Sequence, residues 1–75
     1  MPKLPNNISA SQAIKVLGKV GYLFNRQKGS HIILVNEETH RIAVVPNRKD
    51  LPRGTLRAII SQSGLTIDEF LRLLE

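Results

Sequence analysis

The chain has 75 residues, of which 41% are hydrophobic and 23% charged, and its formal net charge is +5. This length allows one small domain, and the composition is that of a folded protein and not of a disordered one. Cysteine is absent, which excludes disulfides and thiolate zinc sites and favours a reducing compartment. No apolar run reaches the length of a signal-peptide core or a membrane span, so we expect a cytoplasmic protein without a membrane segment.

The first expected element is a helix that follows a short N-terminal tail. Ser9 and Gln12 have the spacing of a capping box, in which each residue bonds to the backbone of the other. The apolar residues of this segment fall on one helical stripe, with Val16 outside it: Ala10, Ala13, Ile14 and Leu17. Gly21 is a suitable stop because glycine readily adopts the left-handed conformation that ends many helices.

Three strands are expected next, over residues 22–26, 30–36 and 40–46. Their short connections favour an antiparallel meander. Gly29 lies in the first connection, where its tolerance of positive φ suits a tight turn. A three-residue turn would bury Tyr22 and Phe24, and we favour it for that reason. A two-residue turn of Lys28 and Gly29 would instead place Arg26 opposite His31.

The second and third strands define two faces of the expected sheet. A three-residue loop over 37–39 would pair Leu34 with Ile42 and Ile32 with Val44, which gives one wholly apolar face for helices to cover. The other face stays open and is mixed in character, with His31, Ile33, Val35, Arg41, Ala43 and Val45. Because side chains alternate along a strand, a slip of one residue would exchange the faces.

Two helices are expected after a polar loop over residues 47–54. The first carries one apolar stripe of Leu56, Ile59 and Ile60 and stops at Gly64. The second begins with a capping box of Thr66 and Glu69. Its apolar face contains Ile67, Phe70, Leu71 and Leu74.

The order helix, three strands, helix, short helix indicates an α+β domain with helices on one face of an antiparallel sheet. We expect residues 1–8 to form an N-terminal tail and residues 9–75 to form a single domain. Seven of the eleven Lys and Arg residues lie in the middle of the chain: Arg26, Lys28, Arg41, Arg48, Lys49, Arg53 and Arg57. Such a cluster suggests a polyanion or an acidic protein as the partner, and a generic basic surface is the alternative.

His31 is the strongest candidate for chemistry. The chain has two histidines and no H-E-x-x-H motif, so we expect no metal site. Ser30 adjoins His31 in a strand, which sends the two side chains to opposite faces and argues against a serine nucleophile. His40 would lie about 16 Å away along the hairpin, too far for a two-histidine site. One histidine among cations suits RNA cleavage by the 2′-OH, because imidazole can take the hydroxyl proton while cations stabilise the phosphate charge.

Two stretches carry a family resemblance: G-Y-x-x-x-R-Q-K-G-S-H at residues 21–31, and VVPNRKDLPRGTLRAIISQSGLTIDEF at residues 44–70. They resemble the HicA family of toxins, also called YcfA-like, over nearly all of residues 9–72. The G-S-H element alone is a weak indicator of this family, but it becomes specific in combination with G-T-L-R and Q-x-G-L-T later in the chain. The resemblance implies a double-stranded-RNA-binding-domain-like fold. It also implies a toxin of a type II toxin–antitoxin pair, an endoribonuclease that cleaves mRNA without a metal or other cofactor and is inhibited by a HicB-type antitoxin.

Carried over residue by residue, the resemblance makes His31 the catalytic residue and makes Thr55 a candidate cap of the second helix. The start of that helix, with two arginines one turn apart, also suits a phosphate. The residues expected to bind RNA are Arg26, Lys28, Gly29, Ser30, Arg41, Arg48, Lys49, Arg53 and Arg57. The chain departs from the family at Arg48, where many members carry a histidine. The alternative function is a non-catalytic double-stranded-RNA-binding module, and charge alone would also permit a DNA-binding subunit.

Overall fold

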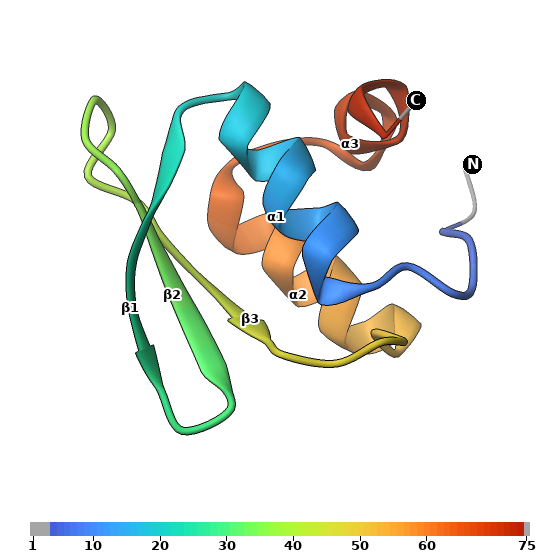
Figure 1. The fold of residues 1–75 in the computed structure, drawn as a ribbon. Helices are drawn as coiled ribbons and strands as arrows, with labels where there is room; N and C mark the ends of the chain where they lie inside the picture. Colours follow the sequence, from blue (N-terminus) through green and yellow to red (C-terminus); the bar gives the residue numbers. More distant parts are fainter. Residues whose placement is uncertain (1–3, 75) are drawn as a thin grey trace.

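A computed structural model describes residues 4–74 of the chain. The elements are α1 (Ala10–Lys19), β1 (Tyr22–Lys28), β2 (His31–Asn36), β3 (Ile42–Pro46), α2 (Arg53–Ser63) and α3 (Ile67–Leu73). The strands form one antiparallel sheet in the order β1-β2-β3, and the helices lie on one face of it (Figure 1). The expected α+β layout is confirmed. The first three residues of the expected tail and the expected last residue of the domain lie outside the described residues.

Helix α1 begins where the sequence predicts. The Ser9 Oγ accepts a hydrogen bond from the Gln12 backbone N at 3.1 Å, and the Gln12 Oε1 accepts one from the Ser9 N at 2.9 Å. The expected stripe is buried, with Ile14 at its margin. Val16, expected outside the stripe, is also buried, because α3 packs against that side of α1. The helix ends before Gly21, whose φ is 98°.

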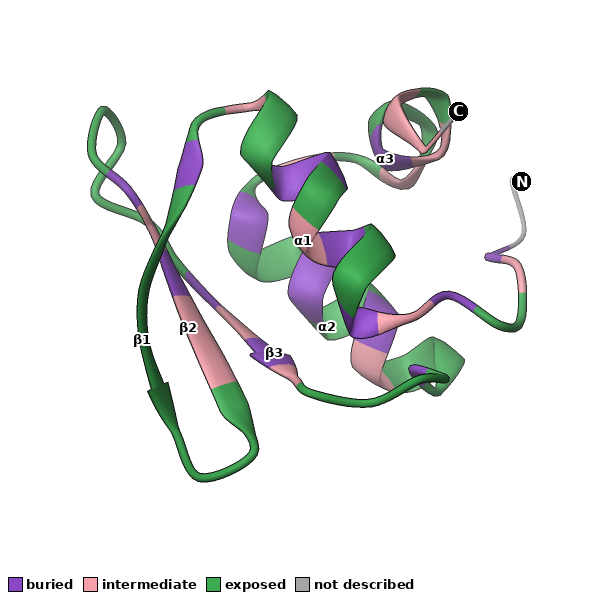
Figure 2. Ribbon diagram, viewed as in Figure 1, coloured by how far each residue is buried: buried purple, intermediate pink, exposed green. Residues whose placement is uncertain are grey.

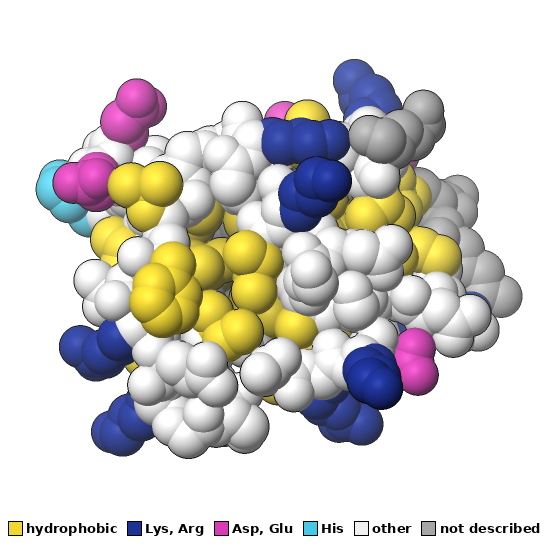
Figure 3. Space-filling model, in the orientation of Figure 1, with side chains coloured by type: hydrophobic (Ala, Val, Ile, Leu, Met, Phe, Trp, Pro, Cys, Tyr) yellow, Lys and Arg dark blue, Asp and Glu magenta, His cyan; other side chains and the backbone are white. Residues whose placement is uncertain are grey.

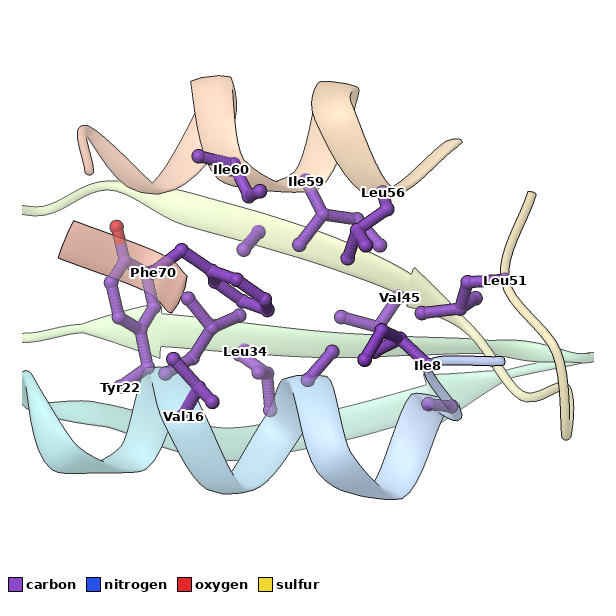
Figure 4. Packing of buried hydrophobic residues seen from close by; sticks show 14 of the residues in the cluster. Ile8, Val16, Tyr22, Leu34, Val45, Leu51, Leu56, Ile59, Ile60 and Phe70 are labelled. Carbon is purple, nitrogen blue, oxygen red and sulfur yellow. The ribbon is translucent and has the colours of Figure 1, made fainter. Parts of the chain in front are cut away.

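The core lies between the sheet and the helices (Figure 2). Its largest fully buried side chains come from all three helices and two strands: Phe70, Leu17, Leu34, Leu56, Ile59, Ile60 and Val45. The segment before α1 contributes too, since Leu4 and Ile8 are buried in the same cluster. Ile8 and Leu51 lie at one end of this core (Figure 4), where the Leu51 N donates to the Ile8 carbonyl oxygen at 2.7 Å. Residues 4–8 are therefore packed against the loop after β3.

The register between β2 and β3 differs by one residue from the expected one. His31 pairs with Pro46 and Leu34 with Ala43. The loop has four residues instead of three: the Asn36 side-chain oxygen accepts from the backbone N of residues 38 and 39, and His40 closes the loop at φ 63°. The expected facing of the third strand is therefore wrong.

The corrected register assigns the faces. Leu34, Ala43 and Val45 are buried under the helices, whereas Ile42 and Val44 lie on the opposite side with His31, Ile33 and Val35. We call this second side the open face. The prediction that His31 lies on the open face is confirmed.

The hairpin of β1 and β2 turns at Gly29 and the residue after it, so that Lys28 pairs with His31. Neither turn expected from the sequence is correct. Tyr22 is buried as expected, but Phe24 is 64% exposed, so its expected burial is wrong. The reason is that β1 is an edge strand with a bulge after Phe24, and the strand extends past the helices, which do not cover it there (Figure 2).

Helix α2 starts at Arg53, after Pro52, which makes no side-chain capping bond. Thr55 lies inside the first turn, so the expectation that Thr55 caps the helix is wrong. Gly64 ends the helix at φ 82°, as expected. The capping box that begins α3 is confirmed: the Thr66 Oγ1 and the carboxylate of residue 69 each accept from the other's backbone N. No helix within residues 4–74 is long and apolar enough to cross a membrane.

Candidate nucleic-acid interface

His31 is the first residue of β2 and is exposed on the open face. Its partners across the sheet are Lys28 on β1 and Pro46 on β3, so these three residues form a row at the end of the sheet. Within the described chain, no side chain or backbone group forms a hydrogen bond or ion pair with the imidazole. Both ring nitrogens are therefore open to a ligand from solvent.

The turn before His31 is held in place by two hydrogen bonds. The Gln27 Nε2 donates to the Gly29 carbonyl oxygen at 3.0 Å, and the Asn47 N donates to the Ser30 carbonyl oxygen at 2.7 Å. Gly29 has φ 59°, and a Cβ built on it would meet nothing within 4 Å. Backbone conformation, and not crowding, thus favours glycine here, and the surface beside the turn stays open for a ligand.

Two cations share the open face with His31. Directly paired residues of antiparallel strands project on the same side, so Lys28 projects beside His31 and Arg26 beside Ile33. These two rows are about 7 Å apart, the rise of two residues along a strand. Both cations are exposed, and within the described residues neither forms an ion pair. Their charges are therefore available to a phosphate near the imidazole.

A second group of cations lies after β3 and on α2. Arg48 and Arg53 line one hollow together with Asn6, Asn7 and Asp50. Lys49 is exposed in the same loop, and Arg57 is exposed one helical turn after Arg53. The bond between residues 47 and 30 joins this loop to the His31 hairpin. Figure 3 shows Lys and Arg side chains along the lower border of the molecule, at the hairpin and near the start of α2.

Arg41 does not lie near His31. It precedes β3 at the opposite end of the sheet, and its Nη1 donates to the Gln62 carbonyl oxygen at 3.3 Å. Its guanidinium also lies against Gly64, where an added Cβ would be 3.1 Å from Nε. Arg41 is opposite Asn36, which is five residues from His31 along β2, or about 16 Å at the rise of a strand. Arg41 therefore lies at the opposite end of the sheet from the histidine, in contrast to Arg26 and Lys28.

Sequence reasoning missed the residues that position the site. Asn47 holds the turn through its backbone N–H, and Asn6 and Asn7 line the arginine hollow from the segment before α1. A backbone donor leaves no signal in residue type, and residues so far apart in sequence do not reveal that they meet. Among the described residues, no group of three or more His, Cys, Asp or Glu side chains is close enough to hold a metal ion.

The chain was also compared with known proteins. No curated protein sequence matches it. Residues 10–65 match the family described as the HicA toxin of bacterial toxin–antitoxin systems. The match runs from the first residue of α1 to just past α2, so it contains the His31 hairpin, the loop after β3 and the start of α2. It covers well over half of the chain and agrees with the resemblance seen in the sequence. The chain therefore belongs to the HicA family and is the toxin of a toxin–antitoxin system.

Proposed function

We propose that this toxin is an endoribonuclease that cleaves mRNA with His31 as its single catalytic histidine. The observation that carries the proposal is the placement of the imidazole. It is exposed on the open face, has no polar partner in the described chain, and stands in one row with Lys28. A histidine that only stabilised the fold would be expected to bond to the protein, whereas a catalytic one must reach the substrate.

The reaction begins when His31 takes the proton of a ribose 2′-OH. The freed oxygen forms a bond to the adjacent phosphorus, and the bond from phosphorus to the 5′-oxygen breaks. The leaving 5′-oxygen takes a proton from water, and the products are a 2′,3′-cyclic phosphate and a 5′-OH. Lys28 and Arg26 stabilise the negative charge that grows on the phosphate oxygens. One positioned acid or base of this kind contributes about 10²–10⁴-fold to the rate.

The second group of cations binds the RNA backbone beyond the cleavage point. Arg48, Lys49, Arg53 and Arg57 contact phosphates, which position the strand but carry no sequence information. No step requires a metal ion or another cofactor, because imidazole and cations supply the proton transfer and the charge stabilisation. Arg41, held at the far end of the sheet, takes no part.

The family assigns the toxin an antitoxin partner. We propose that this partner is of the HicB type and that it keeps the toxin inactive in the cytoplasm, where mRNA is translated. The domain that cleaves RNA extends over residues 9–75.

The test compares the same substitution at both histidines. His31→Asn should lower the cleavage rate by about 10²–10⁴-fold. His40→Asn should leave the rate unchanged, because His40 lies in the β2–β3 loop and asparagine tolerates its positive φ. A substrate with one 2′-deoxyribose at the cleaved position should stay intact there, and excess chelator should have no effect.

Three results would contradict the proposal. They are normal cleavage by His31→Asn, cleavage at the deoxyribose, and loss of activity in chelator. If the wild-type chain binds double-stranded RNA tightly and never cleaves RNA, it is the non-catalytic binding module instead.

A further inference from the structure

The open face has an apolar end away from His31. Leu23, Val35 and Ile42 pair directly across the three strands and form one row. Leu23 is 57% exposed and Ile42 is 54% exposed. Phe24, 64% exposed on the same edge strand, pairs with the buried Leu34, so it projects from the helix side of β1, beyond the helices. We call these four residues the apolar patch. Val35 is four residues from His31, or about 13 Å along β2, so the row of Leu23, Val35 and Ile42 and the histidine occupy opposite ends of the open face.

Large exposed apolar side chains that gather in one place mark an interaction site more often than scattered ones do. Within residues 4–74, the large hydrophobic residues that remain exposed are Leu23, Phe24 and Ile42, and Val35 between them is half-buried. Figure 3 shows hydrophobic side chains reaching the surface in the left half of the molecule, with acidic side chains above them. Val35, Leu23 and Phe24 line a shallow hollow together with Asn25 and Glu37.

The two edges of the sheet differ in the same region. On β3, the Val44 N donates to the Gln62 Oε1 at 3.0 Å, and Pro46, two residues on, has no N–H. The β3 edge is therefore closed to another strand. On β1, no element of the described chain lies beside the outer edge, and every residue after Tyr22 is exposed. The bulge after Phe24 divides this free edge into two regularly paired parts, residues 22–24 at the apolar end and residues 26–28 near His31.

We propose that the antitoxin docks on the apolar patch and the adjoining edge of β1. A polypeptide that pairs its backbone with residues 22–24, as in strand addition to other sheets, has side chains on both sides of the sheet. It can therefore cover Phe24 on the helix side and the row of Leu23, Val35 and Ile42 on the open face. The proposal rests on the family's antitoxin partner and not on RNA cleavage by His31, so either can fail without the other. Docking here anchors the antitoxin about 13 Å from the His31 row, without requiring contact with the imidazole.

Two other occupants are disfavoured by charge and chemistry. RNA would bring phosphates toward Glu37, and it has no backbone that completes a β-ladder. A second copy of the toxin would bring two chains of formal charge +5 together, which repel each other. Neither objection applies to an acidic protein of the antitoxin type. Its backbone can complete a β-ladder, and Arg26 and Lys28, on the other side of the bulge, would attract its negative charge.

The experiment uses the purified toxin and the protein encoded by the neighbouring gene, with affinity measured by calorimetry. Phe24→Ser and Ile42→Thr should each weaken binding by about tenfold or more, as truncation at the centre of an interface does. Lys15→Ala is the control, because Lys15 is exposed on α1 and far from the open face. It should change the affinity less than twofold. RNA cleavage by the two patch variants without antitoxin should equal that of the wild type.

Circular dichroism should confirm that both variants fold, which their exposed positions favour. Unchanged antitoxin affinity in both would overturn the proposal. So would an equal loss of RNA binding, which would assign the patch to RNA. A wild-type toxin that is dimeric by light scattering and becomes monomeric in Phe24→Ser, with antitoxin affinity kept, would assign the patch to self-association and also overturn it.

Discussion

Removal of the Tyr22 hydroxyl should weaken the attachment of the sheet to α2. The Tyr22 Oη donates to the Ser63 carbonyl oxygen at 2.8 Å, and both residues are buried. Ser63 is the last residue of α2, and the last carbonyl oxygens of a helix have no partner within the helix. In Tyr22→Phe this buried oxygen loses its donor, so the free energy of unfolding should fall by about 1–3 kcal/mol.

This is a large share of the stability expected for so small a domain. At about 0.05–0.15 kcal/mol per residue, the whole chain has roughly 4–11 kcal/mol. Each kcal/mol lowers the Tm of a domain of this size by about 4–8 °C, so Tyr22→Phe should melt roughly 4–24 °C below the wild type. Circular dichroism during heating measures the shift. Phe24→Ser is the control on the same strand, and as a surface change it should stay within about 0.5 kcal/mol.

The same hydroxyl makes a second measurement possible. Tyr22 is the only tyrosine and the chain has no tryptophan, so tyrosinate absorbance reports its ionisation alone. Burial raises the pKa of Tyr22 above its ordinary value of 10.0, and the nearby charge of Arg41 offsets part of the rise.

The pKa of Tyr22 is higher in the folded chain than in the unfolded chain. The contribution of the hydroxyl to stability is therefore complete below the unfolded-state pKa, and it is lost as the pH rises through the folded-state pKa. The stability gap between the wild type and Tyr22→Phe should therefore shrink above about pH 10. An unchanged Tm in Tyr22→Phe, or a tyrosine that titrates as in the unfolded chain, would refute this role.

Three further changes have defined outcomes. Gly64→Ala should lower the Tm, with a loss of about 1 kcal/mol or more, because φ is 82° and the new Cβ would lie 3.1 Å from the Arg41 Nε. Hydrogen bonds from Thr66 lower the pKa of Glu69 below its ordinary value of 4.5. The contribution of the Glu69 carboxylate to stability is therefore present above pH 4.5 and is lost as the pH falls through the folded-state pKa. Glu69→Ala should lower the Tm at neutral pH and change it little in strong acid. Lys28→Ala should slow RNA cleavage and reduce the salt slope of RNA binding by about 0.7–1, whereas the charge-matched Arg41→Ala should leave rate and slope unchanged in a salt titration.

The sequence predicted the parts of the fold that depend on neighbouring residues. Both capping boxes form, Gly64 ends α2, and the order of helices and strands is as expected. These features rest on contacts between residues three or four apart, so residue type and spacing are enough to recognise them. The position of His31 on the open face was also predicted, because side chains alternate along a strand and Ile32 and Leu34 were expected to face the helices.

The features that the sequence did not predict depend on loop geometry and on distant packing. The β2–β3 register is set by the Asn36 side chain, which organises a four-residue loop that the spacing does not distinguish from a three-residue one. Phe24 was expected in the core because it is aromatic, but β1 extends beyond the helices. The separation of Arg41 from His31 follows from its place before β3, at the far end of the sheet, and could not be inferred from charge alone.

The bonds between the first segment and the loop after β3 have a consequence for the synthesis of the toxin. The Ile8 carbonyl oxygen accepts from the Leu51 N, and the Ala10 N donates to the Arg48 carbonyl oxygen at 2.9 Å. The segment before α1 leaves the ribosome before the strands do, but its partners at residues 48–51 emerge only after all three strands. A nascent chain that ends before the loop can form the His31 hairpin, yet it lacks the backbone contacts that hold the loop cations. Assembly of the full RNA surface is therefore delayed until the loop after β3 has been translated and has bound the segment before α1.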